Sequence, residues 1–162
     1  MKIVIADLPN DAEQLRIVAD KAFQSTPDSS IDTWFSFVEM EDLIKRERGI
    51  CLKAVTESGG IIGMIVAHQE SPINGKESEE KWVISLEAVL PENSGQGVGS
   101  ALLTELEAKV RSKGATKLFT YTNKDDEKVI NFYKNNGFED AGWIRDYQYG
   151  QGNSAVFLLK YL

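Results

Sequence analysis

The feature that most constrains the fold of this chain is a glycine-rich loop between an apolar run and a stretch with helical spacing. In PENSGQGVGSALL, residues 91–103, glycines stand at Gly95, Gly97 and Gly99. Glycine is costly inside an ordinary helix or strand, so three of them indicate a backbone that needs positive φ or a close approach to a partner. The N–H groups and the dipole at the start of a helix favour an anion, phosphate above all. The loop therefore predicts a strand–turn–helix unit that cradles a pyrophosphate, with a plain flexible turn as the alternative.

Two common phosphate-binding loops do not match the spacing. A P-loop needs a Lys-Ser or Lys-Thr pair after its last glycine, and here Ser100 and Ala101 follow Gly99. The dinucleotide fingerprint has the pattern G-x-G-x-x-G, whereas this loop has G-x-G-x-G and follows several predicted strands. We therefore expect neither a P-loop nor a Rossmann fold.

The remaining periodicities predict an alternation of strands and helices. Strands are expected at residues 2–8, 50–56, 59–69, 81–90, 116–123, 138–150 and 153–162. Helices are expected at residues 10–24, 32–48, 100–114 and 126–137, and a polar loop at 70–80. The fold class that follows is α/β (α+β), with a central, mostly antiparallel, twisted sheet of about seven strands and about four flanking helices. A chain of 162 residues without a repeat or linker is expected to form one domain, 1–162.

Composition narrows the function. The chain has 18 basic and 25 acidic residues and a net charge of −7, which argues against a nucleic-acid binder and fits a cationic small-molecule substrate. The single cysteine, Cys51, lies in the apolar stretch ICLKAV and is expected to be buried and structural. One cysteine and one histidine do not make a usual zinc site, so we expect no metal. No apolar run reaches the roughly 18 residues of a membrane helix, and MKIVIADLPNDAEQ lacks a signal-peptide core, so we expect a cytoplasmic protein without membrane contact.

Two motifs resemble those of the GNAT superfamily of N-acetyltransferases. In LEAVLPENSGQGVGSALL, residues 86–103, a strand ending Val-x-Pro precedes a glycine loop that opens a helix, as in the family's Arg/Gln-x-x-Gly-x-Gly/Ala motif. In DEKVINFYKNNGF, residues 126–138, a Phe-Tyr pair followed by x-x-x-Gly-Phe resembles the family's later helix. The motifs stand in the family's order, separated by a helix and a strand, and the expected order of elements covers the whole chain.

The resemblance implies an acetyl-CoA-dependent N-acetyltransferase with a GNAT-like fold, in which central strands splay to form the CoA cleft. The pantetheine arm would pair with the backbone of residues 87–89, and the pyrophosphate would meet the backbone N–H groups of residues 95–100. The residues implied for the cofactor are Glu87, Ala88, Val89, Ser94, Gly95, Gln96, Gly97, Val98, Gly99, Ser100, Asp126, Asn131 and Lys134. For Lys134, a contact with CoA phosphates and a solvated helix face both remain open.

Two positions depart from the family pattern. Ser94 stands where members usually have Arg or Gln, but the phosphate contacts there are mainly from the backbone, so we expect binding to survive in weakened form. Asp126 stands where many members have Asn. A carboxylate beside the pantetheine arm would be unusual, and the favoured alternative is that Asp126 caps the helix that begins there.

Transfer of an acetyl group to an amine requires two proton transfers: the acceptor ammonium must lose a proton, and the leaving thiolate must gain one. An alkyl ammonium has a pKa near 10.4, so only about one in 10³ is nucleophilic at pH 7, and a group must take its proton. By resemblance, Tyr133 is the general acid that protonates the leaving thiolate, with a buried core tyrosine as the alternative. For the base, Glu87 on the central strand, a water positioned by Ser85 on the same strand face, and a water chain to solvent all remain open. His68 ends a strand and is expected to be structural or at the surface.

The acceptor is expected to be a primary amine of a small molecule or peptide, attacked directly at the thioester. Residues 24–48, the loop 71–80 and the last two strands would form its site. They hold the aromatic residues Trp34, Phe35, Phe37, Trp82, Trp143, Tyr147 and Tyr149 and the acids Asp32, Glu39, Glu41 and Asp42. A homodimer through an exposed edge strand is a further expectation. The alternatives are transfer of a longer acyl group and a non-catalytic acyl-CoA-binding sensor or interaction module on the same fold.

Overall fold

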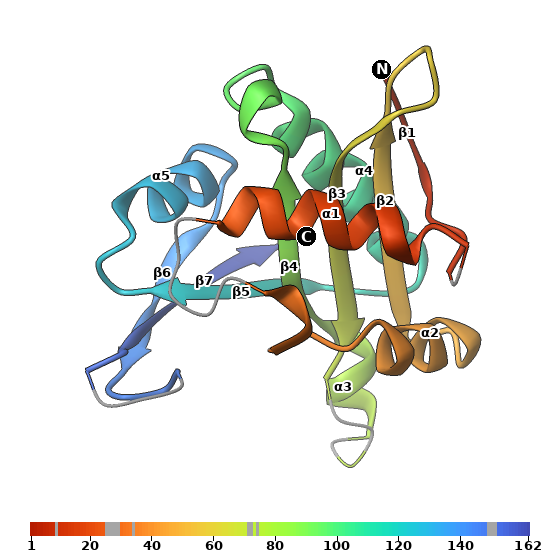
Figure 1. The fold of residues 1–162 in the computed structure, drawn as a ribbon. Helices are drawn as coiled ribbons and strands as arrows, with labels where there is room; N and C mark the ends of the chain where they lie inside the picture. The colour runs from red at the N-terminus through yellow and green to blue at the C-terminus, as the bar shows by residue number, and fades with distance from the viewer. Residues whose placement is uncertain (9, 25–29, 34, 71–72, 74, 149–151) are drawn as a thin grey trace. The chain divides into compact units, whose positions relative to one another are not determined.

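The computed structural model describes residues 1–8, 10–24, 30–33, 35–70, 73, 75–148 and 152–162 (Figure 1). Its strands are β1 (Lys2–Ile5), β2 (Gly49–Val55), β3 (Ile61–Gln69), β4 (Lys81–Val89), β5 (Lys117–Asn123), β6 (Glu139–Ile144) and β7 (Ala155–Tyr161). Its helices are α1 (Ala12–Phe23), α2 (Phe37–Lys45), α3 (Lys76–Glu80), α4 (Val98–Ser112) and α5 (Glu127–Asn135), with 3₁₀ turns η1 (Ile31–Thr33) and η3 (Pro91–Asn93). None of the helices in these ranges is both long and apolar enough to cross a membrane.

The strands form one open sheet in the order β1-β2-β3-β4-β5-β7-β6. β2 pairs antiparallel with β1 and β3, and β7 pairs antiparallel with β5 and β6. β4 and β5 pair in parallel, with Lys81 opposite Lys117 and Val83 opposite Phe119. The predicted fold class, a mixed and mostly antiparallel sheet of seven strands with flanking helices, is therefore confirmed.

Two predicted strands are shorter in the structure: the strand expected over 2–8 ends at Ile5, and the one expected over 138–150 ends at Ile144. β6 stops there because the chain turns at Asp146, whose φ of +53° is incompatible with a strand. Two helical segments also differ from the sequence prediction. The helix expected over 32–48 is instead η1 followed by α2, because Ser36 is extended and its Oγ accepts a hydrogen bond from the Glu39 N–H at 3.2 Å, which begins a new helix. The polar loop expected over 70–80 contains α3, whose Ser78 Oγ donates to Glu70 O at 3.1 Å. α3 brings the described part of the chain to five α-helices where about four were expected.

Contacts divide the described chain into two compact units. The first unit comprises Met1–His68 with Ser85–Lys109, and the second comprises Gln69–Ile84 with Val110–Leu162. The division falls within β4, so each unit holds one half of that strand. The expectation of a single domain, 1–162, stays a prediction, and the units are described separately below.

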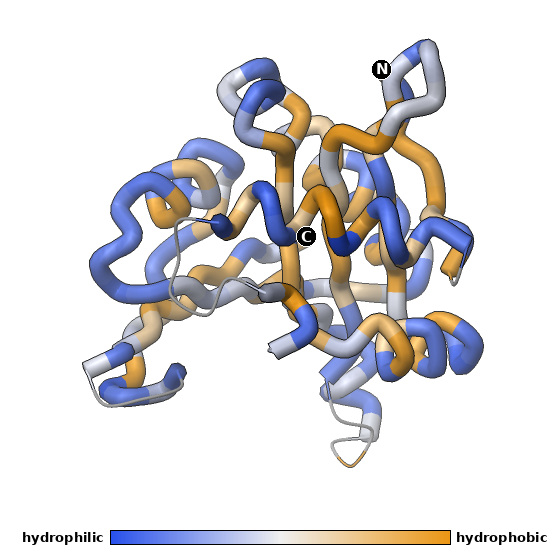
Figure 2. The backbone as a smooth tube through the Cα atoms, viewed as in Figure 1, coloured by the Kyte–Doolittle hydropathy of each residue, from blue (hydrophilic) through white to orange (hydrophobic). Residues whose placement is uncertain are grey.

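In the first unit, helices pack on both faces of the sheet. α1 and α2 cover one face of β2 and β3 and α4 covers the other, and α1 alternates between apolar and polar positions along its length (Figures 1 and 2). The core on the α1 and α2 side includes Leu15, Val18, Phe37, Met40, Cys51, Met64, Val66, Leu86 and Ala88. On the opposite face, Gly63 leaves room for α4, because a Cβ there would lie 3.1 Å from the side chains of both Val98 and Leu102. The glycine thus lets the start of α4 pack directly on β3.

In the second unit, α5 ends in a tight aromatic turn. Tyr133 is buried between Phe132 and Phe138, with ring centroids 5.1 Å away on each side. Gly137 has φ of +87°, and the Phe138 N–H then donates to Tyr133 O at 3.0 Å, which closes the helix. Lys160 of β7 joins this turn through a 2.8 Å hydrogen bond from Nζ to Asn136 O.

Candidate active site

The glycine loop begins where β4 ends. Leu90 N–H donates to Ile62 O at 2.9 Å, and η3 then turns the chain away from the sheet. Gly95 and Gly97 have φ of +77° and +80°, the left-handed region in which a side chain is strained. Two of the three glycines are therefore required by backbone conformation, whereas the third, Gly99, lies in the first turn of α4.

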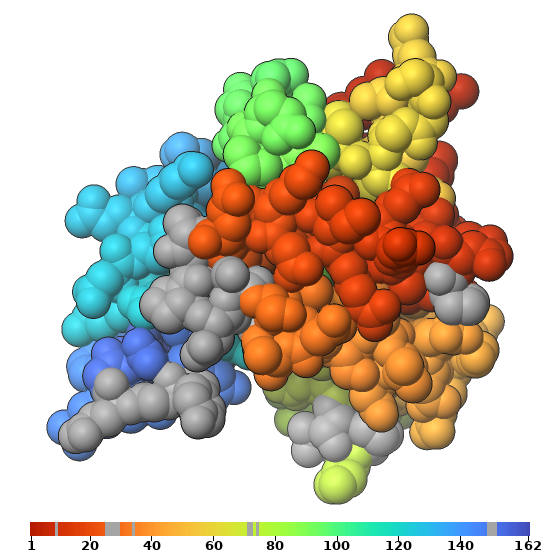
Figure 3. All heavy atoms as spheres, in the orientation of Figure 1, coloured from red at the N-terminus to blue at the C-terminus, as the bar shows by residue number. Residues whose placement is uncertain are grey.

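The loop presents backbone donors at the start of α4. The first hydrogen bond of the helix runs from Ala101 N–H to Gly97 O at 3.0 Å, so the N–H groups of residues 98–100 precede the helical ladder. The first turn of α4 contains no acidic residue, and its dipole favours negative charge. Residues 94–97 are exposed, in the green part of the surface in Figure 3. The loop is held by a 2.9 Å hydrogen bond from Gln96 Nε2 to Glu92 O. This cradle fits a diphosphate group.

β4 presents two different faces. Its burial alternates strictly, with Ile84, Leu86 and Ala88 buried and Ser85 and Glu87 half-buried on the other face. Ser85 Oγ is buried and has no hydrogen-bond partner among the residues that the structure describes. The same holds for Trp82 Nε1, which lies on the fully buried face of the strand. The central strand thus carries two polar side-chain atoms that form no hydrogen bond with any described residue.

The predicted site residues fall into two groups. The residues of β4 and the glycine loop, Glu87–Val89 and Ser94–Ser100, are contiguous in the first unit. Asp126, Asn131, Tyr133 and Lys134 lie on or beside α5 in the second unit. Tyr133 is buried, whereas Asn131 and Lys134 are exposed on α5.

Three sequence predictions about single residues can be followed in the structure. Asp126 is the N-cap of α5, since its Oδ1 accepts a hydrogen bond from Val129 N–H at 3.1 Å, which confirms the capping alternative. Cys51 is buried on β2, and burial raises the pKa of its thiol to about 12, so it is structural as predicted. His68 is half-buried near the end of β3, opposite Gly49.

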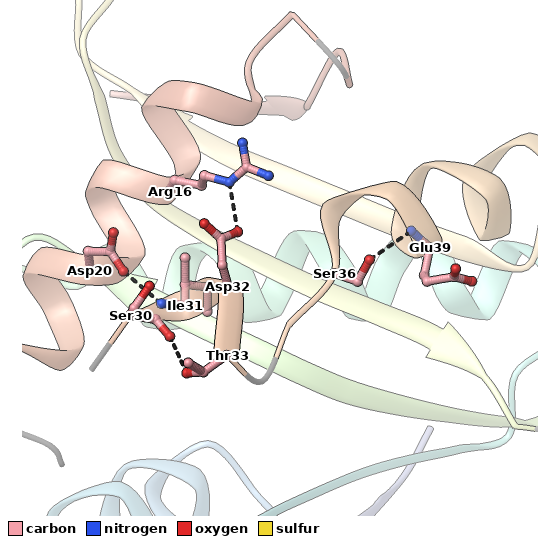
Figure 4. A network of polar contacts seen from close by, with 8 residues as sticks. All are labelled: Arg16, Asp20, Ser30, Ile31, Asp32, Thr33, Ser36 and Glu39. Carbon is pink, nitrogen blue, oxygen red and sulfur yellow. Dashed lines mark hydrogen bonds and ion pairs between the residues drawn. The ribbon is translucent and has the colours of Figure 1, made fainter. Parts of the chain in front are cut away.

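The acids expected to recognise a cationic acceptor largely pair with cations of the same chain. Arg16 Nε lies 2.9 Å from Asp32 Oδ1 (Figure 4). The Arg16 guanidinium also lies over the ring of Phe37, 5.0 Å from its centroid. In α2, Glu41 pairs with Lys45 at 2.6 Å and Asp42 pairs with Arg46 at 2.9 Å. The carboxylates of Asp32, Glu41 and Asp42 therefore form ion pairs within the α1–α2 region, so they are less available to bind a cationic acceptor.

The aromatic residues expected at the acceptor site differ in their surroundings: some are packed or buried and others are exposed. Trp34 and Tyr149 lie outside the described residues, Phe35 packs edge-to-face on Phe37, and Trp82 is fully buried. Trp143 is exposed on β6 with Lys124 Nζ 4.3 Å from its ring centroid.

Tyr147 belongs to a cluster that the sequence prediction missed in part. Its ring lies 5.1 Å from that of Tyr121 on β5 and 5.0 Å from that of Phe157 on β7. Burial, and secondarily the Tyr147 hydroxyl, raise the pKa of Tyr121. The alternation in LFTYTN places Tyr121 on one face of β5, but only the antiparallel register, Tyr121 opposite Phe157, brings the residues together.

Comparisons with known proteins agree with this architecture. The model of the Acetyltransferase (GNAT) family matches residues 12–138. The Bacillus subtilis (strain 168) protein YdhI is 36% identical over 88 residues, which are 54% of this chain and 49% of YdhI, so the match spans about half of that relative. The ribosomal-protein-alanine N-acetyltransferase of Brucella melitensis has a similar structure, with a TM-score of 0.81, 20% identity and complete coverage of both chains. An aminoglycoside 6'-N-acetyltransferase complexed with coenzyme A gives a TM-score of 0.76 and 20% identity over 99% of this chain and 97% of that one.

Proposed function

Because the chain belongs to the Acetyltransferase (GNAT) family, we propose that it is an N-acetyltransferase that moves an acetyl group from acetyl-CoA to a primary amine. The observation that carries the proposal is the cradle at the start of α4. Gly95 and Gly97 adopt the left-handed conformation there, and the first turn of the helix has no competing carboxylate. A flexible turn would need neither feature.

The donor, when bound, supplies an acetyl group activated as a thioester. In this chain the N–H groups of residues 95–100 hold its diphosphate, and the backbone of Glu87–Val89 pairs with its amide arm. Ser94 supplies no guanidinium or amide side chain at the loop, so the charge of the diphosphate is met by backbone dipoles. The exposed cation of Lys134 is proposed to add a phosphate contact, and Asn131 and Asp126 to border the arm, Asp126 mainly as the cap of α5.

Two side chains are proposed to move protons. Glu87, on the half-buried face of the central strand, takes the proton that the acceptor ammonium must lose before it attacks the thioester directly. Tyr133, buried in the aromatic turn of α5, gives a proton to the departing thiolate. A phenol is chemically suited to this role, because the reference pKa of tyrosine, about 10, lies above that of a thiol, about 8.5.

The acceptor is proposed to be an amine of a small molecule or peptide. Two structures with the same fold are named for such acceptors, an aminoglycoside in one case and an alanine of a ribosomal protein in the other. In the second unit, the exposed rings of Tyr121 and Tyr147 are suited to attract a cation. In the first unit, Glu39 is an exposed acid. A cytoplasmic location and a homodimer stay predictions.

Calorimetric titration with acetyl-CoA, dephospho-CoA and ATP tests the donor site. We expect acetyl-CoA to bind at micromolar concentration and clearly more tightly than ATP. Gly97→Ala should weaken this binding, whereas Gly59→Ala, which places the same strain in the β2–β3 turn at φ of +88°, should leave it unchanged. Failure of acetyl-CoA to bind the unaltered protein would overturn the proposal.

A second assay tests the chemistry. Release of free CoA thiol is followed while the protein is offered polyamines, aminoglycosides and peptides with free N-termini. We expect amine-dependent release that Tyr133→Phe lowers without loss of acetyl-CoA binding. Binding without release for any amine would favour a non-catalytic acyl-CoA-binding module.

A further inference from the structure

Ser85 places a hydroxyl group in the middle of the apolar strand β4. Its Oγ is buried and has no hydrogen-bond partner among the described residues. Two other hydroxyls in the described chain, both on fully buried residues, have partners. Ser78 Oγ donates to Glu70 O at 3.1 Å, and Thr120 Oγ1 donates to Ile84 O at 3.5 Å. Buried hydroxyls are almost always hydrogen-bonded to protein or to ordered water, so Ser85 points to a bound molecule.

The nearest polar side chain on the same face of β4 as Ser85 is that of Glu87. The alternation of β4 puts Ser85 and Glu87 on the same face, opposite the core residues Leu86 and Ala88. Two residues along a strand span roughly 6.6 Å, a gap that one water can bridge when the longer side chain is a glutamate. A buried water needs two to four polar partners, and this face offers a hydroxyl and a carboxylate.

We propose that the Ser85 hydroxyl holds a water molecule through which the acceptor ammonium passes its proton to Glu87; this rests on the proposed function. The N–H bond of the ammonium breaks as its proton moves to the water oxygen. The same water gives one of its protons to the Glu87 carboxylate, where a new O–H bond forms. The water is regenerated, the amine nitrogen gains its lone pair, and no oxidant or reductant takes part. Ser85 is thus a positioning residue, because its own O–H bond is not broken.

The structure supplies a matched pair of variants. Ser85→Ala removes a hydroxyl without a partner in the described chain, whereas Ser78→Ala removes one that hydrogen-bonds Glu70. We expect Ser85→Ala to lower kcat about tenfold with KM for the amine and affinity for acetyl-CoA changed less than twofold. Its Tm should stay the same or rise, because no intramolecular hydrogen bond is lost. Ser78→Ala should show the reverse, a lower Tm and an unchanged kcat. Ser85→Thr keeps the hydroxyl and should recover most of the lost kcat.

A crystal structure of the unaltered protein provides a readout that does not depend on turnover. We expect an ordered water within hydrogen-bond distance of Ser85 Oγ, and its loss in Ser85→Ala. Absence of that water, or a wild-type kcat in Ser85→Ala, would overturn the inference. The donor-site titration tests the proposed function in the unaltered protein, so a failure there is distinguished from a failure of the water site.

Discussion

Gly63→Ala is expected to disturb the glycine loop from a distance. A Cβ at this position would lie 3.1 Å from Leu102 Cδ1, 3.1 Å from Val98 Cγ1 and 3.2 Å from Ala88 O. Contacts this short force the neighbours to move by a few tenths of an ångström, and the backbone oxygen of Ala88 cannot rotate away as a side chain can. Overpacking of this kind costs about 1–3 kcal/mol.

The displacement reaches the donor site because Val98 is the first residue of α4. A shift there moves the N–H groups that we propose to hold the diphosphate, so acetyl-CoA affinity should fall about tenfold, equivalent to roughly 1.4 kcal/mol. For a domain of this size, each kcal/mol of stability corresponds to roughly 2–4 °C in Tm, so Tm should fall by roughly 2–12 °C. Thermal unfolding by circular dichroism and calorimetric titration with acetyl-CoA measure the two effects.

Gly60→Ala is the matched control in the same strand pair. Its added Cβ would lie 3.4 Å from Thr56 Oγ1, an ordinary contact, and its φ is outside the left-handed region. We expect unchanged affinity and a Tm that stays the same or rises slightly. A Gly63→Ala protein with wild-type Tm and wild-type affinity would refute the packing argument. So would an equal loss of affinity in Gly60→Ala.

Three further predictions concern single side chains. Asp126→Ala should remove the cap of α5 and lower the free energy of unfolding by about 1 kcal/mol, whereas Asp126→Asn should keep it, as measured by urea unfolding. Burial raises the pKa of Cys51 from 9.0 to about 12, so the folded chain retains a proton that the unfolded chain loses. Stability should therefore fall as pH rises above about 9, and Cys51→Ala should lack this component in urea titrations at several pH values. Glu87→Gln should flatten the acidic limb of the pH–rate profile for kcat, and an unaltered profile would exclude Glu87 as the base.

The sequence placed all seven strands, because each has a short apolar period bounded by turn residues, but it made two of them too long, since β1 ends at Ile5 and β6 at Ile144. It misjudged two helices for related reasons. Apolar spacing continues from residue 32 into α2, so the break at Ser36 was visible only as a capping hydrogen bond to Glu39 N–H. In α3 the segment KESEE has no apolar face to give it a period, although Glu77 and Lys81 are spaced for the ion pair observed at 3.2 Å.

The parts of the candidate site that are formed by backbone conformation and backbone hydrogen bonds could be predicted from the sequence. The glycine loop and the cap at Asp126 follow from residue types within a few positions of one another. The acceptor region was less predictable, because Asp32 is paired with Arg16 from a segment 16 residues away. The contact of Tyr121 with Tyr147 and Phe157 likewise depends on the register of β5 with β7.

The sequence by itself determined the features that act locally: the left-handed turns at Gly95 and Gly97, the donors at the start of α4, and the alternation of β4. These follow from sterics and hydrogen bonding between residues close in the chain. Only the tertiary structure decided that Gly63 leaves room for α4 and that Ser85 has a buried hydroxyl without a partner in the described chain. Packing and burial depend on segments brought together by folding, and no local pattern records which atoms they place around a side chain.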